Sequence, residues 1–244
     1  MEAKKIIQDG LAVCGIEFGS TRIKAVLTDT DGNVLATGGH DWENTYADGV
    51  WTYSLDEVRR GLASCYGSLR SEVERRYEVT PESFAAIGIS GMMHGYLPFD
   101  AAGEQLARFQ TWRNTNTQEA ADILTEKFNF NIPLRWSIAH LYQRILDGEE
   151  HLPRIAKITT LAVYVHRLLT GEYVAGVGEA SGMFPIDRKT CSYDESMLAA
   201  FDELVKDRAF PWKIRDILPE VRVAGEYAGT LTEEGAAPWM PPGI

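Results

Sequence analysis

The segment that most constrains the fold is a tight turn between two short apolar runs. Leu11–Ile16 and Ile23–Asp29 are rich in β-branched and other apolar residues, and a six-residue segment, Glu17–Arg22, separates them. Short apolar runs on either side of a Gly-Ser pair are typical of two strands joined by a turn. Asp31-Gly-Asn33 then supplies a second turn before Val34–Thr37, so we predict a three-strand antiparallel meander.

The next segments alternate between helix and strand. Ser54-Leu-Asp-Glu57 is a capping box, which predicts a helix that starts after Ser54 and runs to about Tyr77. Phe84–Ser90 is an apolar strand that ends at Gly91. Three hairpin strands followed by a helix and another strand predict an α/β fold, with a mixed sheet flanked by helices.

The second half of the chain is rich in predicted helices. Gly171 is a predicted C-cap of the helix expected over Ile158–Leu169. No change in composition divides the chain into independent domains. Apolar residues at helical spacing occur in Thr117–Phe128, Ile138–Asp147, Ile158–Leu169 and Ser196–Val205.

The first turn carries groups that suit a phosphate ligand. Gly19 allows close backbone approach, Ser20 and Thr21 offer hydroxyl groups and turn amides, and Lys24 adds a positive charge. Glu17 suits a water-mediated contact with Mg²⁺, because magnesium usually keeps several waters and takes few protein carboxylates. The alternative is an ordinary hairpin in which Gly and Ser serve only the turn.

Composition argues against several classes of partner. Thirty-five acidic and 24 basic residues give a formal net charge of -11, which disfavours nucleic acid and anionic membranes. The N-terminus has neither the apolar run nor the cleavage site of a signal peptide, and no apolar stretch reaches about 18 residues, so we expect a cytoplasmic protein. The three cysteines are far apart in the sequence, and we expect Cys14 to be buried on a strand.

Two common nucleotide-binding motifs do not fit. The glycines at 176, 178 and 182 have one residue too many between the last two for a dinucleotide fingerprint, and no βαβ pattern surrounds them. The sequence also lacks the Gly-x-x-x-x-Gly-Lys-Ser/Thr pattern of a P-loop.

Gly15–Lys24 nevertheless resembles the first phosphate motif of the actin, hexokinase and sugar-kinase superfamily, with Glu17 where Asp is usual. Ala86–Gly95 narrows the resemblance to the FGGY carbohydrate kinases, because it is similar to the xylulokinase segment Gly-x-Ser-Gly-Gln-Met-His-Gly. The resemblance implies that Met93 and His94 contact the sugar. A structural role for a single His at a strand end is the alternative.

Further segments resemble the same family in order along the chain. Phe109–Asn114 is similar to the family's Trp-x-Asp/Asn segment, which implies that Trp112, Arg113 and Asn114 line the sugar site, although Trp112 could equally be a core residue. Three more segments resemble fold markers of the family: Thr160–Glu172, Glu179–Gly182 (with Glu in place of the usual Asp) and Ile217–Ala236.

The resemblance, which covers about residue 11 to the last residue, implies an actin-like (ribonuclease-H-like) fold and a sugar kinase that uses ATP and Mg²⁺. A ketopentose such as xylulose is favoured as substrate, while ribulose, fuculose, glycerol and gluconate stay open. In the family the general-base Asp lies in a Gly-Gly-Asp turn, which would follow residue 244, and the second domain binds most of the adenosine. We therefore expect the protein's own C-terminal domain to complete the site and the 244 residues alone to be inactive. The alternative is a non-catalytic actin-like module that binds a sugar or nucleotide, and a homodimer is also left open.

Overall fold

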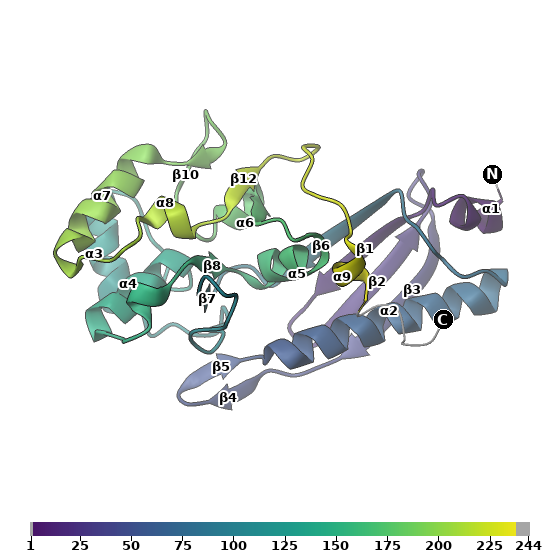
Figure 1. Cartoon of the computed structure of the whole chain (residues 1–244), viewed down its shortest axis with the longest axis horizontal. Coiled ribbons are helices and arrows are strands. Elements are labelled where there is room, and N and C mark those ends of the chain that lie inside the picture. The colour runs from purple at the N-terminus through teal and green to yellow at the C-terminus, as the bar shows by residue number, and fades with distance from the viewer. Residues whose placement is uncertain (1, 238–244) are drawn as a thin grey trace. The chain divides into compact units, whose positions relative to one another are not determined.

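The computed structural model describes residues 2–237, which form two compact units (Figure 1). Among the described residues, the first unit comprises 2–44, 53–91 and 231–237, and the second comprises Thr45–Thr52 and Met92–Thr230. Each unit is described by itself.

The first unit is built on a four-stranded mixed sheet with the order β3-β2-β1-β6. The strands β1, β2 and β3 form the predicted antiparallel meander, and β6 pairs with β1 in parallel. The mixed sheet and its meander are therefore confirmed. The strands are β1 (Val13–Phe18), β2 (Arg22–Thr28), β3 (Val34–Asp41) and β6 (Ala86–Gly91).

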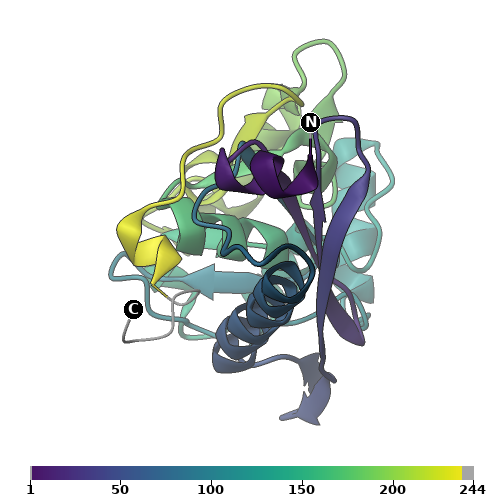
Figure 2. The same ribbon diagram turned by 90° about the vertical axis from the view of Figure 1, so that its right-hand side faces the viewer.

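A long helix, α2 (Leu55–Tyr77), covers one face of this sheet, as the end-on view in Figure 2 shows. It begins with the predicted capping box, in which the Ser54 hydroxyl accepts from the Glu57 amide at 3.1 Å and the Glu57 carboxylate accepts from the Ser54 amide at 3.0 Å. Two short helices complete the unit, α1 (Ala3–Gln8) and α9 (Glu233–Ala236).

The strands alternate between buried and more exposed side chains. Cys14, Ile16 and Phe18 of β1 are buried, as expected for Cys14, whereas Glu17 between them is exposed. Strand β2 follows the same pattern, with Ile23 buried and Lys24 exposed. The buried set packs toward α2, since a Cβ on Gly61 of that helix would meet Ile23 at 2.5 Å. The opposite face carries the polar side chains.

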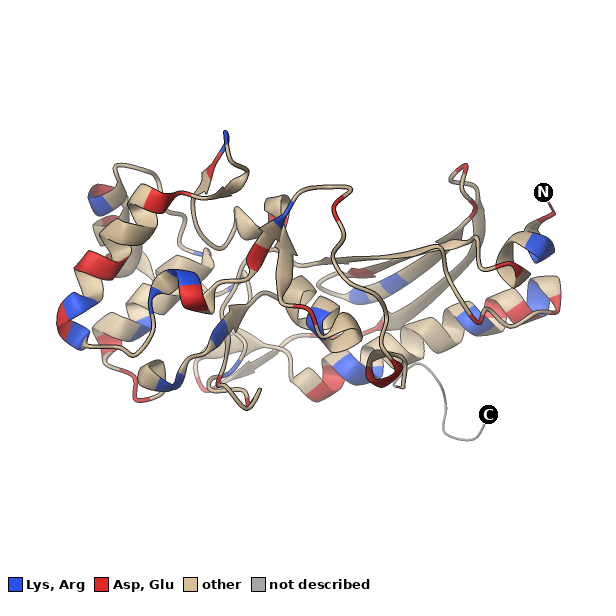
Figure 3. Cartoon of the chain, turned by 45° about the horizontal axis from the view of Figure 1, so that its top comes forward, with Lys and Arg blue, Asp and Glu red and all other residues tan. Residues whose placement is uncertain are grey.

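Acidic and basic residues are interspersed along α2 (Figure 3). Several pair at helical spacing, including Arg70 with Glu74 at 2.8 Å and Arg75 with Glu72 at 2.8 Å. Such surface pairs add little to stability but give the helix a solvated outer face. Across the described part of the chain, no helix combines the length and apolar character needed to cross a membrane.

The second unit consists of helices and short paired strands around its own apolar core. Its largest fully buried side chains include Tyr96, Phe109, Phe184 and Phe201. The elements are β4 (Thr45–Ala47), β5 (Val50–Thr52), β7 (Leu97–Phe99), α3 (Gln118–Phe128), α4 (Ser137–Asp147), η1 (Leu152–Arg154), β8 (Lys157–Thr159), α5 (Leu161–Thr170), β9 (Val174–Gly176), α6 (Val177–Ala180), β10 (Ile186–Asp187), β11 (Ser192–Tyr193), α7 (Glu195–Val205), η2 (Lys206–Arg208), α8 (Ile214–Ile217) and β12 (Glu220–Arg222).

Most predicted helices of this unit are confirmed, and one boundary is wrong. The helices α3, α4 and α7 match their predicted ranges to within one residue, and Gly171 ends α5 with φ +76°. The prediction of a single helix over Ile158–Leu169 is wrong, because Lys157–Thr159 is strand β8 and α5 starts only at Leu161. Strand pairing of β8 with β7 overrides the local apolar periodicity there.

Candidate functional site

The first candidate site is the turn between β1 and β2, which is shorter than the sequence predicts. Gly19 donates its amide to the Arg22 carbonyl at 3.1 Å, which leaves Ser20 and Thr21 as a two-residue loop. Glu17 and Lys24 therefore lie in the paired strands and not in the turn. A Cβ at position 19 would lie 2.9 Å from the Arg22 carbonyl oxygen, so the close strand approach requires glycine.

Two aromatic residues hold the carbonyl groups of this loop. Trp42 Nε1 donates to the Gly19 carbonyl at 2.7 Å, and the Tyr53 hydroxyl donates to the Ser20 carbonyl at 2.6 Å. The backbone amide of Trp42 donates to the Thr21 carbonyl at 3.2 Å. The carbonyls of three successive residues are thus drawn to one side of the loop.

The opposite ends of these peptide groups carry the amides. No peptide bond among the described residues is cis, and in a trans peptide the C=O and the following N–H point in opposite directions. The N–H groups of Ser20 and Thr21 therefore point away from Trp42 and Tyr53. Adjacent outward amides form the kind of nest that binds an anion.

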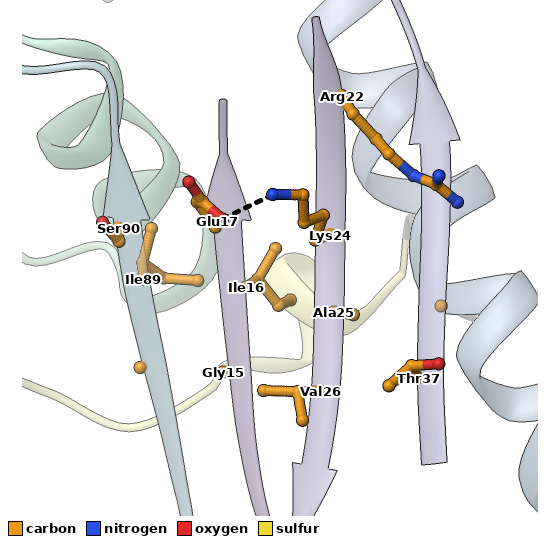
Figure 4. Close-up of a pocket in the computed structure, with 12 residues that line it drawn as sticks. Gly15, Ile16, Glu17, Arg22, Lys24, Ala25, Val26, Thr37, Ile89 and Ser90 are labelled. Atoms are coloured by element: carbon orange, nitrogen blue, oxygen red, sulfur yellow. Dashed lines mark hydrogen bonds and ion pairs between the residues drawn. The ribbon is translucent and has the colours of Figure 1, made fainter. Parts of the chain in front are cut away.

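Charged side chains stand beside this turn (Figure 4). Lys24 Nζ lies 3.4 Å from Glu17 Oε2, and these residues are direct cross-strand partners. Arg22 points away from the pair and across β3, where its Nε lies 3.5 Å from Asp41 Oδ1. The open sheet face thus presents two cations, each with a carboxylate counter-charge.

The same face holds an open hollow of about 660 Å³. Gly15 and Gly88, which have no side chains, lie in the adjacent strands β1 and β6 and line it, and Ser90 of β6 stands opposite Glu17. A small molecule with polar groups at one end has room here. Ser90 and Arg22 were not among the predicted site residues, and their places beside Glu17 and Lys24 become evident only when the strands are paired.

The donor set fits the expected nucleotide and metal. Outward amides, hydroxyls and Lys24 suit phosphate oxygens, and the exposed carboxylate of Glu17 suits a magnesium ion that keeps most of its waters. No cluster of three or more His, Cys, Asp or Glu side chains occurs within residues 2–237, so a metal here would depend on phosphate and water for most of its ligands.

The second candidate site surrounds Met93 and His94 in the other unit. Met93 is exposed, and His94 has a left-handed backbone with φ +72°. This conformation costs a non-glycine residue about 1–2 kcal/mol, so the surrounding contacts must enforce it. His94 Nδ1 lies 3.4 Å from the Gly182 carbonyl, and a Cβ at Gly182 would be 2.6 Å from the same nitrogen. The glycine therefore allows the imidazole its position.

Ser137, the first residue of helix α4, forms hydrogen bonds with two segments next to His94. The Ser137 hydroxyl donates to the Gly95 carbonyl at 2.6 Å, and the Ser137 amide donates to the Gly182 carbonyl at 3.4 Å. Tyr96, next in the chain, exchanges two backbone hydrogen bonds with Gln110, at 2.9 and 3.0 Å. The predicted sugar segments at 93–95 and 109–114 therefore lie side by side, together with the turn at 179–182.

A fully buried histidine supports the second of these segments. His140 Nδ1 lies 3.1 Å from Gln110 Oε1, whereas its Nε2 is buried with no hydrogen-bond partner among the described residues. Burial lowers the pKa of His140 to about 3, so the ring is neutral at pH 7. Burial also lowers the pKa of His94, and the charge of Arg135 acts in the same direction.

A partly buried series of polar contacts holds the hydroxyl group of Tyr96. The Tyr96 hydroxyl lies 2.7 Å from His151 Nε2, and His151 Nδ1 lies 3.1 Å from Glu149 Oε2. Because the carboxylate accepts from Nδ1–H, the neutral ring accepts the Tyr96 proton at Nε2. Arg144 of α4 also contacts Glu149, at 3.0 Å. This ion pair links the contacts of Tyr96 to α4, the helix whose Ser137 holds the Gly95 carbonyl.

The predicted wall residues Trp112, Arg113 and Asn114 differ in their surroundings. Trp112 is 37 % exposed, and Arg113 lies over the Trp51 ring at 4.2 Å from its centroid. Asn114 is buried. Its side-chain oxygen Oδ1 accepts from the backbone N–H of Trp51 at 2.9 Å, and its Nδ2 donates to the backbone carbonyl of Trp51 at 2.8 Å. Asn114 thus anchors strand β5, while Trp112 keeps surface available for a ligand.

The sequence did not reveal the supporting residues Trp42, Tyr53, Ser137, His140 and Gly182 as functional. Each acts through a contact with a residue far away in the sequence, so local motifs give no signal for it. The capping box that starts directly after Tyr53 is the nearest local sign, because it fixes the start of α2 two residues beyond Tyr53.

The mixed sheet, with its antiparallel meander and the parallel strand β6, places the chain in the actin-like ATPase fold. Solved structures agree: a ligand-bound xylulose kinase from Lactobacillus acidophilus has a TM-score of 0.76 at 17% identity, covering 93% of this chain and 45% of that one. A gluconate kinase from the same organism has a TM-score of 0.75 at 18% identity, covering 93% and 45%.

The family follows from the sequence comparison. The model of the FGGY family of carbohydrate kinases, N-terminal domain, matches residues 12–244, and the chain therefore belongs to this family. A glycerol kinase from Thermococcus gammatolerans is 23% identical over 91% of this chain and 45% of its own length. A xylulose kinase from Klebsiella pneumoniae is 22% identical over 94% of this chain and 46% of its own length. The chain thus spans about half the length of the curated relatives it matches.

Proposed function

We propose that this chain forms the sugar- and phosphate-binding half of an ATP-dependent kinase that phosphorylates a hydroxyl group of a sugar or polyol. The observation that carries the proposal is the β1–β2 turn, where outward Ser20 and Thr21 amides stand beside the Glu17–Lys24 pair. In phosphoryl transfer there is little covalent chemistry for the protein, so positioning and charge stabilisation dominate. This turn supplies both.

In the proposed reaction the hydroxyl oxygen of the sugar attacks the γ-phosphorus of ATP, the bond to the β-phosphate oxygen breaks, and ADP leaves. The proton of the hydroxyl passes to a general base. Mg²⁺, when bound, neutralises charge on the phosphate oxygens. Lys24 and the turn amides bind those oxygens, and Glu17 orders water around the metal.

We assign sugar recognition to Met93, His94 and Trp112. A neutral His94 donates from one ring nitrogen and accepts at the other, which suits a hydroxyl group. Trp112 offers an indole face to the C–H face of a sugar. The Met-His pair favours a ketopentose such as xylulose, and we expect the base, an Asp, to lie outside these 244 residues, as the family resemblance implies.

Titration of the chain with a panel of pentoses, glycerol and gluconate tests the sugar half. We expect at best millimolar affinity, because one wall of a cleft must bind without closing contacts. His94→Ala should weaken binding further. Sub-micromolar affinity for any sugar would instead support a sensor module.

Catalysis is tested with MgATP and xylulose. We expect no phosphoryl transfer above background from residues 1–244, and activity from a longer protein that includes the second domain. In that longer protein, Glu17→Ala should lower kcat more than it raises the KM for sugar. Robust turnover by the 244 residues would mean that the general base lies within them, and the assignment of roles would have to be abandoned.

A further inference from the structure

The loop that carries the outward amides has no glycine at its two central positions. Its central residues, Ser20 and Thr21, are flanked by Gly19 and Arg22, which close the hairpin. Such a short loop can rotate its peptide planes unless another part of the protein holds them. What holds them therefore decides whether the amides face an anion.

Trp42 and Tyr53 are the residues that contact these peptide planes. Their rings stack at 4.2 Å between centroids with 29° between planes, and Tyr53 is 1% exposed while Trp42 is 8% exposed. Phe18 of β1 meets the Trp42 ring edge-on at 6.0 Å. The pair is therefore rigid, and each ring presents one polar hydrogen to one loop carbonyl.

The two contacts act on different peptide groups. Trp42 Nε1 binds the Gly19 carbonyl, which belongs to the peptide that carries the Ser20 N–H. The Tyr53 hydroxyl binds the Ser20 carbonyl, which belongs to the peptide that carries the Thr21 N–H. Each aromatic residue thus sets the direction of one amide.

We propose that Trp42 and Tyr53 are positioning residues of the phosphate turn, which hold the Ser20 and Thr21 amides toward a polyphosphate ligand. The inference rests on the proposed function. Neither side chain touches the ligand, because both lie on the carbonyl side of the loop. Their effect is to remove the cost of orienting the amides when the anion binds.

The test uses pyrophosphate with Mg²⁺ as the probe and the whole chain as the protein. Calorimetry gives the dissociation constant, and ¹⁵N NMR follows the amides of Ser20 and Thr21. The variants are Trp42→Phe and Tyr53→Phe, which keep an aromatic ring and remove one hydrogen bond each. Tyr66→Phe is the matched control, because it removes a buried hydroxyl that donates to the Pro81 carbonyl elsewhere in the same unit.

We expect each variant to weaken pyrophosphate binding about three- to tenfold, the equivalent of one hydrogen bond. Tyr53→Phe should reduce the response of the Thr21 amide most, and Trp42→Phe that of the Ser20 amide. The control should bind like the wild type, even if it loses comparable stability.

The outcomes separate this inference from the proposed function. If the wild type does not bind pyrophosphate, both fail. If the wild type binds and the two variants bind equally well, or if Tyr66→Phe weakens binding to the same extent, the positioning role is overturned while the phosphate site stands.

Discussion

Glu17 of β1 and Lys24 of β2 lie directly opposite each other, with Lys24 Nζ 3.4 Å from Glu17 Oε2. Members of the superfamily that the sequence resembles usually carry Asp at the position of Glu17. Aspartate is one methylene shorter, so from the same backbone its carboxylate would lie farther from the ammonium group of Lys24 as that side chain is placed here. The longer side chain therefore gives Lys24 an internal counter-charge that an anionic ligand must replace.

Two substitutions at Glu17 separate its proposed roles toward lysine and metal. Glu17→Asp should bind metal-free pyrophosphate more tightly than the wild type, by less than about fivefold, because the pair is exposed and screened. It keeps a carboxylate for Mg²⁺. Glu17→Gln should show the same gain without metal but lose the benefit of added Mg²⁺. Calorimetric titrations with and without Mg²⁺ measure both effects, and undiminished metal dependence in Glu17→Gln would remove Glu17 from the metal site.

Gly182 offers a test of how tightly the His94 ring is held. In Gly182→Ala the new Cβ would lie 2.6 Å from His94 Nδ1 and 3.3 Å from Met93 Cε, so both side chains must move. We expect a small loss of stability, since His94 can swing aside, and a clear loss of sugar binding. Gly178→Ala in the preceding short helix, α6, is the control, because a Cβ there meets nothing within 4 Å. Equal sugar affinities of the two variants would show that the His94 position is unimportant.

Local signals in the sequence predicted the elements of the fold well. The capping box at Ser54 marked the first residue of α2, and Gly171 marked the end of α5. The candidate site was predicted less completely, because long-range contacts decide which polar groups face a ligand. Asn114 shows the difference: its place beside Trp112 suggested a role in sugar binding, but its amide is engaged by Trp51, which lies 63 residues away in the sequence.

Asn114 can be tested for the role its contacts favour. Asn114→Ala leaves the Trp51 N–H without its partner, so the free energy of unfolding should fall by about 1–3 kcal/mol. Arg113→Ala, which removes the charge above the Trp51 ring, should cost less, about 0.5–1 kcal/mol. Denaturant unfolding measures both. A neutral Asn114→Ala that nonetheless weakens sugar binding would restore a direct contact with the sugar.

The free energy of unfolding should fall as the pH drops below the pKa of an ordinary histidine. Burial lowers the pKa of His140 to about 3, and it also lowers the pKa values of His94 and His151. Glu149 opposes the shift at His151, whereas Arg144 and Arg154 add to it.

The sign of this dependence follows from proton binding. Near pH 6.5 and below, the histidines of the unfolded chain become protonated, whereas those of the folded protein stay neutral because their pKa values are lower. Stability is therefore highest above pH 6.5 and decreases as the pH falls toward the pKa of each folded histidine. His140 alone should contribute a slope of roughly 1.4 kcal/mol per pH unit between pH 6 and 4.5. Unfolding free energies across this range measure the slope, and His140→Gln should flatten it while removing only one of the three histidines. A wild-type stability that stays constant from pH 7 to 4.5 would mean that His140 is accessible to protons in the folded protein, contrary to its full burial against Gln110.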